Sequence, residues 1–371
     1  MFIGIPKEIK EMEFRVSSTP NNVKELVANS HKVFVQKTAG LGAGFSDEEY
    51  KAAGAEMLDT IEDVYEKAEM IIKVKEPLPP EFSLMKEGLI LFTYLHLAPV
   101  PDLTDELLKD KITGIAYETI EKNGTLPLLI PMSEVAGRMA VQVGAFYLQK
   151  HNGGRGVLLG GVPGVPPGKV VIVGGGLVGT NAAKMAIGLG ARVYILDVDT
   201  DRLRYLDDVF GGRLHTVMSS PGNIADQVKD ADLLVGAVLI PGAKAPKLVT
   251  DEMVATMPEG SVIVDVAIDQ GGCVETIKTT THADPIYTVH GVVHYGVANM
   301  PGAFARSSTL ALTNATSLYA IKIANMGWKD ALRSDEGFLK GLNVYDGQLT
   351  CAPVAEAQGR ECVDPKEMII S

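Results

Sequence analysis

The stretch that decides the fold reads Val170-Val-Ile-Val-Gly174-Gly175-Gly176-Leu-Val-Gly179. An apolar strand is followed by the spacing G-x-G-x-x-G where a helix begins, which is the context that this motif requires. Gly174 permits a tight turn, Gly176 lets the backbone approach a pyrophosphate, and Gly179 allows the helix to pack closely on the strand. The helix N-terminus offers amide donors and the positive end of its dipole to that diphosphate. The stretch therefore predicts a dinucleotide-binding turn.

The next apolar strand, expected at 192–196, is followed directly by Asp197. An acid at this position binds the ribose 2′-hydroxyl of the adenosine half and repels a 2′-phosphate. We therefore expect the cofactor to be NAD rather than NADP. The alternative is a purely structural turn with an aspartate at the surface.

Outward from this turn, short strands and helices alternate along the chain, which predicts parallel α/β sheets. A helix over 133–150 is long enough to connect two domains, and the Gly/Pro-rich stretch 153–168 marks a boundary or an ordered loop. After the last long helix the C-terminal tail is expected to be polar and irregular. Strands are expected at 2–5, 31–36, 70–74, 89–95, 170–173, 192–196, 233–238 and 261–268, with helices at 20–28, 47–53, 133–150, 179–189 and 311–326.

Composition excludes several functional classes. The 371 residues include 34 Lys and Arg against 46 Asp and Glu, a formal net charge of −12, so the chain has no general attraction for nucleic acid or anionic lipid. Cys273, Cys351 and Cys362 lack metal-ligand spacing and are odd in number, so we expect neither a metal site nor a disulfide framework. No apolar run reaches the ~18–20 residues of a membrane span and no signal peptide is evident, so we expect a cytoplasmic protein.

Several long blocks of sequence are unusual in their residues. The blocks are Gly4-Ile-Pro-Lys-Glu8, Arg15-Val-Ser-Ser-Thr-Pro20, Val74-Lys75-Glu76-Pro77, Tyr94-Leu-His96-Leu-Ala98, Gly161-Val-Pro-Gly164, the run from Gly236 to Pro246, Asp265-Val-Ala-Ile-Asp269-Gln-Gly-Gly272, Val297-Ala-Asn299-Met-Pro301 and Ala311-Leu-Thr-Asn-Ala315. These blocks resemble the family of the alanine dehydrogenases and the NAD-binding subunits of proton-pumping transhydrogenase. The similarity extends from residue 4 to about residue 345 and is stronger to the alanine dehydrogenases around Lys75, His96 and Asp269.

The resemblance implies reversible oxidative deamination of L-alanine by NAD⁺ and water, giving pyruvate, ammonium and NADH. It also implies two Rossmann-like domains with doubly wound parallel sheets, an active-site cleft between them, and usually a homohexamer. The NAD-binding domain is expected at 132–306, inserted into a substrate domain formed by 1–131 and 307–371. No metal and no membrane or nucleic-acid partner is expected.

The resemblance assigns the substrate carboxylate to Arg15, and a guanidinium suits that task because it can bind a carboxylate through two parallel hydrogen bonds. Lys75, at the end of a strand, is implied to reach the carboxylate or carbonyl of the substrate. From the residues alone, Lys73 serves equally well. Tyr94 is expected to orient the substrate or to pack, Met132 to confine the pocket, and Asn299 completes the predicted substrate site.

His96 is implied to be the general acid and base, since the carbinolamine intermediate needs proton transfers near neutral pH, where imidazole titrates. Asp269 is implied to assist it by activating water or stabilising the iminium. The alternatives are a hydrogen-bonded core histidine and a turn-capping aspartate. Asp265 is expected to be structural.

The remaining cofactor contacts are also implied by the resemblance. Ser133 is alternatively a helix N-cap, and Lys278 stands where the family usually has arginine. Ser17 and Ser18 also depart from the family pattern, behind Arg15. The predicted NAD contacts are Ser133, Gly174, Gly176, Leu177, Val178, Gly179, Asp197, Arg202, Ser219, Val238, Leu239, Ile268, Lys278, Val297 and Met300.

Two rival functions remain at this point. One is a transhydrogenase-type subunit that binds NAD(H) and passes hydride to a membrane partner. The other is a sister dehydrogenase that acts on a larger amino or imino acid.

Overall fold

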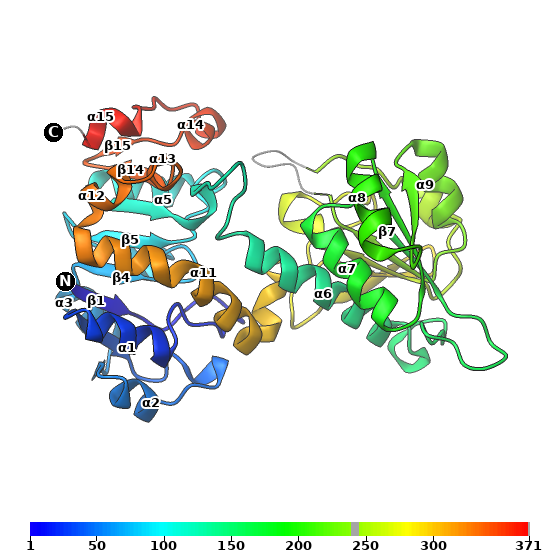
Figure 1. Cartoon of the computed structure of the whole chain (residues 1–371), viewed down its shortest axis with the longest axis horizontal. Coiled ribbons are helices and arrows are strands. Elements are labelled where there is room, and N and C mark those ends of the chain that lie inside the picture. Colours follow the sequence, from blue (N-terminus) through cyan, green and yellow to red (C-terminus); the bar gives the residue numbers. More distant parts are fainter. Residues whose placement is uncertain (239–244, 370–371) are drawn as a thin grey trace. The chain divides into compact units, whose positions relative to one another are not determined.

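The computed structural model describes residues 1–238 and 245–369, and its chain divides into two compact units. The first unit comprises residues 1–132 and the chain from Gly302 onward, and the second comprises residues 133–301. Figure 1 traces the chain through both units. Helix α6 (Ile130–Tyr147) contains the sequence position at which the first unit gives way to the second.

The first unit contains a mixed sheet that is parallel over its first six strands in the chain. Over the described residues the strand order is β15-β14-β6-β5-β4-β1-β2-β3, so the order reverses between β1 and β4. Only the two C-terminal strands run antiparallel to their neighbours. The strands are β1 (Phe2–Ile5), β2 (Lys32–Gln36), β3 (Glu56–Leu58), β4 (Met70–Ile72), β5 (Ile90–Thr93), β6 (Thr113–Ala116), β14 (Leu342–Tyr345) and β15 (Gln348–Leu349).

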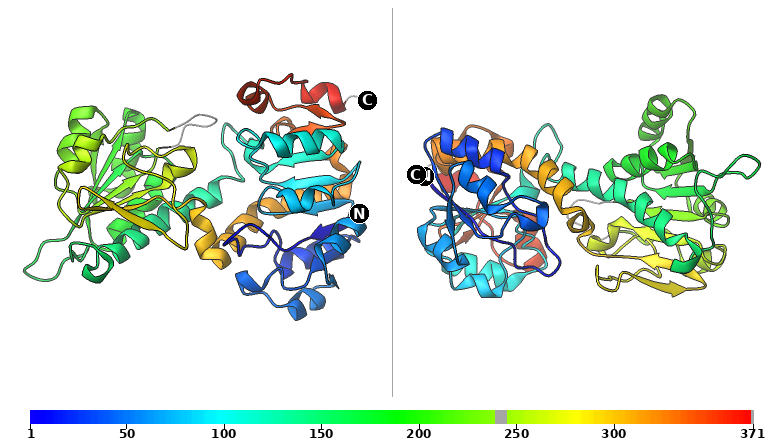
Figure 2. Two further views of the ribbon diagram at one scale, coloured as in Figure 1. Left: turned by 180° about the vertical axis from the view of Figure 1, so that it is seen from behind. Right: turned by 90° about the horizontal axis from the view of Figure 1, so that it is seen from below.

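Helices cover both faces of this sheet. Helices α1 and α11 lie on one face in Figure 1, and Figure 2 shows the opposite face from behind. On that opposite face a buried cluster joins Tyr65 of α3 and Leu107 of α5 to Ile71 and Leu91 of the central strands. The helices are α1 (Pro20–Ala28), α2 (Asp47–Ala52), α3 (Ile61–Lys67), α4 (Pro79–Phe82), α5 (Pro101–Lys109), α11 (Ala305–Met326), α12 (Trp328–Arg333), α13 (Glu336–Leu339), α14 (Ala352–Gln358) and α15 (Pro365–Ile369), with short 3₁₀ turns η1 (Leu41–Ala43) and η2 (Tyr117–Thr119).

The second unit repeats the same central strand order. Over its described residues the order is β12-β13-β11-β10-β7-β8-β9, with only β12 antiparallel, so the reversal falls between β7 and β10. The strands are β7 (Lys169–Val173), β8 (Arg192–Asp197), β9 (His215–Met218), β10 (Leu233–Gly236), β11 (Val262–Asp265), β12 (Ile286–Val289) and β13 (Val292–Tyr295). The helices are α7 (Leu177–Gly188), α8 (Thr200–Phe210), α9 (Pro221–Val228) and α10 (Asp251–Ala255), with 3₁₀ turns η3 (Lys150–Asn152) and η4 (Val266–Gln270). The 3₁₀ turn η5 (Met300–Phe304) contains the sequence position at which the second unit gives way to the first.

Glycines bring α6 and α7 close together in the second unit. A Cβ atom on Gly137 would lie 2.2 Å from the carbonyl oxygen of Val178, so only glycine permits this approach. Gly144 packs against Leu233 of β10 in the same way. A separate cluster, which includes Ile224, Val228 and Val254, packs α9 and α10 against the sheet. The second sheet is therefore also covered by helices.

The fold class predicted from sequence is confirmed, as two mostly parallel α/β sheets. The expected irregular C-terminal tail is wrong, because 342–349 forms β14 and β15 and the chain then forms α14 and α15. Leu342 and Val344 are fully buried there. Ser133 is not a helix N-cap either, since α6 already begins at Ile130. The proline-rich run 77–80 contains the start of α4, with proline in the first turn of that helix.

Candidate active site

Lys75 and Lys73 follow the carboxyl end of β4 but lie in different environments. The Lys73 side chain is 0% exposed, with its Nζ 2.8 Å from Glu81 Oε1 and 3.2 Å from Glu8 Oε2. The Lys75 side chain is 12% exposed, and its Nζ lies 3.9 Å from Glu76 Oε2. Buried ion pairs therefore occupy the Lys73 ammonium, and Lys75 is the better candidate for a substrate contact.

Arg15 is buried and fixed in direction by Glu13, a residue that the sequence did not indicate. Its Nε donates to Glu13 Oε1 at 2.7 Å and its Nη2 donates to Glu13 Oε2 at 2.5 Å. Nη1 points to the sulfur of Met132 at 3.1 Å. Burial alone would lower the pKa of Arg15, but the hydrogen bond and charge of Glu13, together with Tyr94 and Glu8, outweigh burial and raise that pKa. The guanidinium is thus held charged beside Met132.

The serines that follow Arg15 connect its segment to the rest of the first unit. Ser17 Oγ donates to the carbonyl oxygen of Ile72, the last residue of β4, at 2.6 Å. The hydroxyl of Tyr50 donates to the carbonyl oxygen of Ser18 at 2.7 Å. Both serines are buried. This departure from the family pattern therefore supplies a hydrogen bond that joins the Arg15 segment to β4.

His96 follows the carboxyl end of β5, and 39% of its side chain is exposed. Its φ is 48°, in the left-handed region that a non-glycine residue seldom adopts. Glu118 stabilises this turn, because its Oε1 accepts the backbone N–H of His96 at 2.6 Å and that of Leu95 at 3.1 Å. The same oxygen lies 4.0 Å from His96 Nδ1. Sequence reasoning missed Glu118, although an acid just past a third parallel strand of the same sheet was a usable signal.

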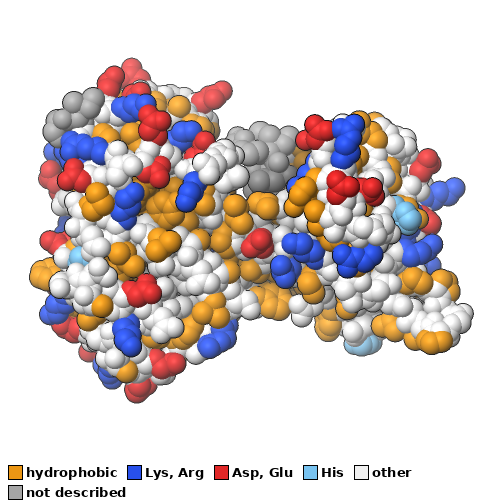
Figure 3. Space-filling view, in the orientation of Figure 1, with side chains coloured by type: hydrophobic (Ala, Val, Ile, Leu, Met, Phe, Trp, Pro, Cys, Tyr) orange, Lys and Arg blue, Asp and Glu red, His pale blue; other side chains and the backbone are white. Residues whose placement is uncertain are grey.

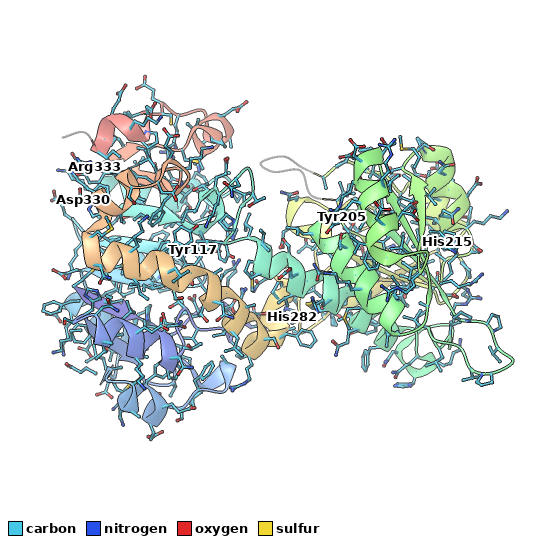
Figure 4. The ribbon with its side chains drawn as sticks, in the orientation of Figure 1. Tyr117, Tyr205, His215, His282, Asp330 and Arg333 are labelled. Carbon is cyan, nitrogen blue, oxygen red and sulfur yellow. The ribbon has the colours of Figure 1, made fainter. Side chains whose placement is uncertain are left out.

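Tyr94 packs beside the imidazole. The Tyr94 and His96 rings are stacked, with centroids 5.6 Å apart and an 11° angle between their planes. The Tyr94 hydroxyl donates to the carbonyl oxygen of Leu128 at 2.5 Å, and burial raises its pKa. Tyr117, which lies behind α11 in Figure 4, packs edge-on against Tyr94 with centroids 5.1 Å apart. Tyr94 is thus a fixed wall beside His96.

The glycine turn of the second unit has the geometry of an anion site. Gly174 has φ +105°, and a Cβ atom on Gly179 would lie 1.8 Å from the Gly174 carbonyl oxygen. Gly176 is the N-cap of α7, no side chain caps that helix, and nothing lies within 4 Å of the position of a Gly176 Cβ. The space beside Gly176 is therefore open, and a helix start without a side-chain cap suits a diphosphate.

Asp197 and Arg202 support this turn. Asp197 Oδ2 accepts the backbone N–H of Gly175 at 2.7 Å, and Oδ1 accepts that of Asp199 at 2.9 Å. Arg202 donates to the Gly175 carbonyl oxygen and to Thr180 Oγ1, both at 2.6 Å. The acid predicted to bind the ribose therefore lies directly beside the glycines, at the carboxyl end of β8.

Asp269 lies in η4, a short turn after β11. Its Oδ1 accepts the backbone N–H of Asn299 at 3.3 Å, and Asn299 has φ 58°. Asp265 ends β11 and accepts backbone N–H groups of Ala267, Cys273 and Val274 within 3.0 Å, which is a structural role. Asp269 and Asn299 belong to the second unit, whereas Arg15, Lys75 and His96 belong to the first.

The other predicted cofactor residues lie near the glycine turn, in the segments after β11, or outside the described residues. Leu177 and Val178 begin α7, the Ser219 backbone N–H donates to the Asp197 carbonyl oxygen at 2.9 Å, and Val238 lies beside Gly174. Ile268 lies in η4, Val297 pairs with Thr280, and Met300 begins η5. Lys278 places its Nζ 4.5 Å from the Tyr287 ring centre. Leu239 lies outside the described residues.

Comparisons with known proteins show the family to which the chain belongs. The N-terminal domain model of the alanine dehydrogenase/PNT family matches residues 4–136, and its C-terminal domain model matches 140–352. The chain belongs to the alanine dehydrogenase/PNT family. An alanine dehydrogenase of Methanococcus maripaludis is 63% identical over 359 residues, 96% of each chain. One of Bacillus subtilis is 58% identical over 371 residues, covering 100% of this chain and 98% of that one.

Solved structures separate the two branches of the alanine dehydrogenase/PNT family. A structure of L-alanine dehydrogenase superposes with TM-score 0.94 at 54% identity, covering 97% of this chain and 99% of that chain. A transhydrogenase from Sinorhizobium meliloti superposes with TM-score 0.82 at 25% identity, covering 95% and 99%. The resemblance stated from sequence is confirmed, and the dehydrogenase branch is favoured over the transhydrogenase alternative.

Two features are absent from residues 1–238 and 245–369 of this family member. Within them, no helix is both long and apolar enough to cross a membrane. No group of three or more His, Cys, Asp or Glu side chains in that part of the chain is arranged to hold a metal ion. On the face shown in Figure 3, acidic and basic side chains are interspersed over both units.

Proposed function

We propose that this chain is an NAD-dependent alanine dehydrogenase, which converts L-alanine and water to pyruvate and ammonium and also catalyses the reverse reaction. The observation that carries the proposal lies in the first unit. There the buried Arg15 guanidinium interacts electrostatically with Tyr94, whose ring stacks on the half-exposed imidazole of His96. A fixed cation and an acid–base group beside one wall suit a small substrate that carries a carboxylate and exchanges protons.

The second unit fits NAD. The open backbone at Gly176 and the uncapped start of α7 suit the diphosphate, and Asp197 suits the ribose. The exposed apolar side chains of Leu177 and Val198 flank this position and would cover an adenine ring. When bound, NAD⁺ supplies the hydride acceptor for the substrate Cα.

The residues of the chain then account for the other steps. Arg15 and Lys75 hold the substrate carboxylate while loss of hydride from Cα leaves an iminium. His96 removes a proton from water as the water oxygen bonds to the iminium carbon, and the product is a carbinolamine. His96 returns this proton to the carbinolamine nitrogen and then accepts the hydroxyl proton as the C–N bond breaks, so that ammonia leaves and the oxygen becomes the pyruvate carbonyl. The released ammonia takes up a proton to give ammonium. Asp269 assists water activation or stabilises the iminium, and Met132 and Asn299 confine the substrate.

Assembly as a homohexamer in the cytoplasm completes the proposal and rests on the family resemblance. Support for self-association comes from a loop of the second unit in which Leu158, Val162 and Val165 are all exposed. Contiguous apolar groups on a surface are typical of protein–protein contacts. Sedimentation analysis of the purified chain tests the assembly, since a monomer at micromolar concentration would contradict it.

The deciding experiment measures NADH oxidation with pyruvate, with and without ammonium, for the unvaried chain, His96→Ala and Asp269→Ala. We expect turnover that requires ammonium, and a loss of about 10²- to 10⁴-fold in kcat for His96→Ala. His151→Ala, which removes an exposed histidine of η3, is the matched control and should leave kcat unchanged. NADH binding without turnover would contradict the proposal, and turnover only with larger 2-oxo acids would favour a sister dehydrogenase.

A further inference from the structure

A buried group of three ionisable side chains lies beneath the segment that carries Lys75. Glu8, Lys73 and Glu81 are all buried, and the Lys73 Nζ lies within 3.2 Å of a carboxylate oxygen of each acid. Buried charges are costly unless they are paired and hydrogen-bonded. The proposed mechanism uses none of the three, so their retention in the core requires another reason.

Glu8 connects this group to the Lys75 backbone. One oxygen, Oε2, contacts the Lys73 ammonium, while Oε1 accepts the backbone N–H of Val74 at 2.6 Å and lies 3.4 Å from that of Lys75. Glu8 follows β1 and Lys75 follows β4, which are neighbours in the sheet. This is the point at which the strand order reverses, where ligands of such sheets bind. Glu8 therefore fixes the chain where Lys75 leaves the sheet.

Glu81 holds the other end of the same segment. Its Oε1 contacts the Lys73 Nζ at 2.8 Å and accepts the Tyr65 hydroxyl at 3.0 Å, while Oε2 accepts the backbone N–H of Leu78 at 2.9 Å. One ammonium thus joins two carboxylates that bind the backbone before and after Lys75-Glu76-Pro77. Burial lowers the pKa of Lys73, but Glu8 and Glu81 outweigh it and raise that pKa, so the ammonium stays charged.

We propose that Glu8 is a positioning residue for Lys75, directing the Lys75 ammonium toward the substrate carboxylate or carbonyl through its bonds to the Val74 and Lys75 amides. This inference rests on the proposed function. Glu81 offers a matched control, because it is equally buried and binds the same ammonium but contacts Leu78 instead of Lys75.

The test compares Glu8→Gln with Glu81→Gln. Each carboxylate accepts donors on both oxygens, and a glutamine offers only one acceptor oxygen, so each variant loses one of these contacts. We expect similar falls in thermal unfolding temperature for both variants. Misplacement of Lys75 should raise the KM for pyruvate by about 10- to 100-fold in Glu8→Gln only, whereas Glu81→Gln should change it by less than about twofold.

A double-variant cycle separates positioning from general damage. Pyruvate affinity for the NADH-loaded chain is measured for Glu8→Gln, Lys75→Met and the double variant, so the readout does not require turnover. We expect the effect of Glu8→Gln to vanish in the Lys75→Met background, because the residue it positions is absent. Equal weakening in both backgrounds, or an unchanged pyruvate affinity in Glu8→Gln, would overturn the inference.

One further variant and one control on the unvaried chain make the outcome unambiguous. If Glu8→Gln does not fold, Glu8→Asp keeps the charge and both acceptor oxygens but shortens the side chain, and it must weaken pyruvate binding in the same Lys75-dependent way. Lys75-independent weakening in Glu8→Asp would overturn the inference. Failure of the proposed function is distinguishable, because the unvaried chain would then fail to oxidise NADH with pyruvate and ammonium.

Discussion

The two units share a central strand order but use its reversal point differently. In the first unit, β1 and β4 are neighbours, and buried charges hold the segments that follow these two strands. Glu8 is bonded there to Lys73 and to the backbone N–H of Val74. In the second unit, between β7 and β10, Gly174 lies against the backbone of Ala237 and Val238. In the proposed function, one topology therefore serves anion recognition in two ways, with side-chain cations in the first unit and with main-chain amides in the second.

The difference has an energetic consequence. A side-chain cation must be desolvated and paired before it can hold a small carboxylate, so stability and recognition depend on the same residues in the first unit. A glycine turn before a helix offers main-chain amides that have no partner within the helix. Anion binding in the second unit therefore depends on how closely the backbone of the turn can approach the ligand. Substitutions in the two units should therefore fail in different ways.

The largest effect is expected from Arg15→Met, which leaves the buried Glu13 carboxylate without its partner. Removal of one member of a buried ion pair costs about 3–5 kcal/mol in free energy of unfolding, and substrate binding is lost as well. Denaturant unfolding and pyruvate kinetics measure the two losses. The double variant Glu13→Leu/Arg15→Met should recover most of the stability and none of the activity. An equal loss of stability in the single and the double variant would contradict the claim that the unpaired Glu13 carboxylate causes the instability.

The next largest effect is expected from Gly179→Ala, which tests whether NADH binding in the second unit depends on close packing of the backbone. A Cβ atom there would lie 1.8 Å from the Gly174 carbonyl oxygen, so the glycine turn must shift. We expect NADH to bind about 100-fold more weakly in a fluorescence titration, equivalent to about 2.7 kcal/mol. Gly188→Ala, in the same helix with nothing within 4 Å of its Cβ position, is the control and should leave NADH affinity unchanged.

A smaller effect is expected from Asp197→Asn. The asparagine keeps an acceptor oxygen for the Gly175 N–H but removes the negative charge that disfavours a 2′-phosphate. The ratio of kcat/KM for NADH over NADPH should fall about tenfold. Asp199→Asn changes the neighbouring acid, which caps α8, and should leave the ratio unchanged. An unaltered ratio in Asp197→Asn would show that backbone contacts alone select the cofactor.

The smallest effect concerns the pH dependence of stability at Glu76. Burial raises its pKa, but Lys75 and Lys10 outweigh burial and hold it below the ordinary value of 4.5. This contribution is therefore fully present above pH 4.5 and lost as the pH falls through the lower, folded-state pKa. Lys10→Met should reduce the stability difference between neutral and acidic pH by up to about 1 kcal/mol, since Lys10 is partly exposed. Unfolding curves across the acid range measure it, and an unchanged difference would contradict the assignment.

Much of the fold could be predicted from local pattern. The helix over 20–28, the Ser46-capped helix and the glycine turn all begin where the sequence indicates, because proline, capping residues and glycines act within a few residues. The C-terminal strand β14 could not be predicted in this way. Leu342 and Val344 form a strand because β6 lies beside them, more than two hundred residues earlier in the chain.

In the candidate site, too, some residues could be predicted from local sequence and others only from the folded structure. Arg15, Lys75 and His96 could be named from their blocks of sequence, but Lys73 could be set aside only when the structure placed it within 3.2 Å of two buried carboxylates. Glu118 was missed although it follows a third parallel strand of the same sheet, and Glu13 was missed although it lies two residues before Arg15. Only the folded structure shows that the Glu13–Arg15 pair is buried and that Glu118 binds the backbone at His96.

By itself, the sequence determined the family, the α/β class, the glycine turn and the residue types that the proposed chemistry needs, since each depends on local spacing and side-chain identity. Tertiary structure alone decided which lysine is paired in the core and which acid supports the turn at His96. These choices depend on strand order and burial, which bring β1 beside β4 and β5 beside β6. The free energy of a charged side chain is set by those spatial neighbours and by its exposure to water.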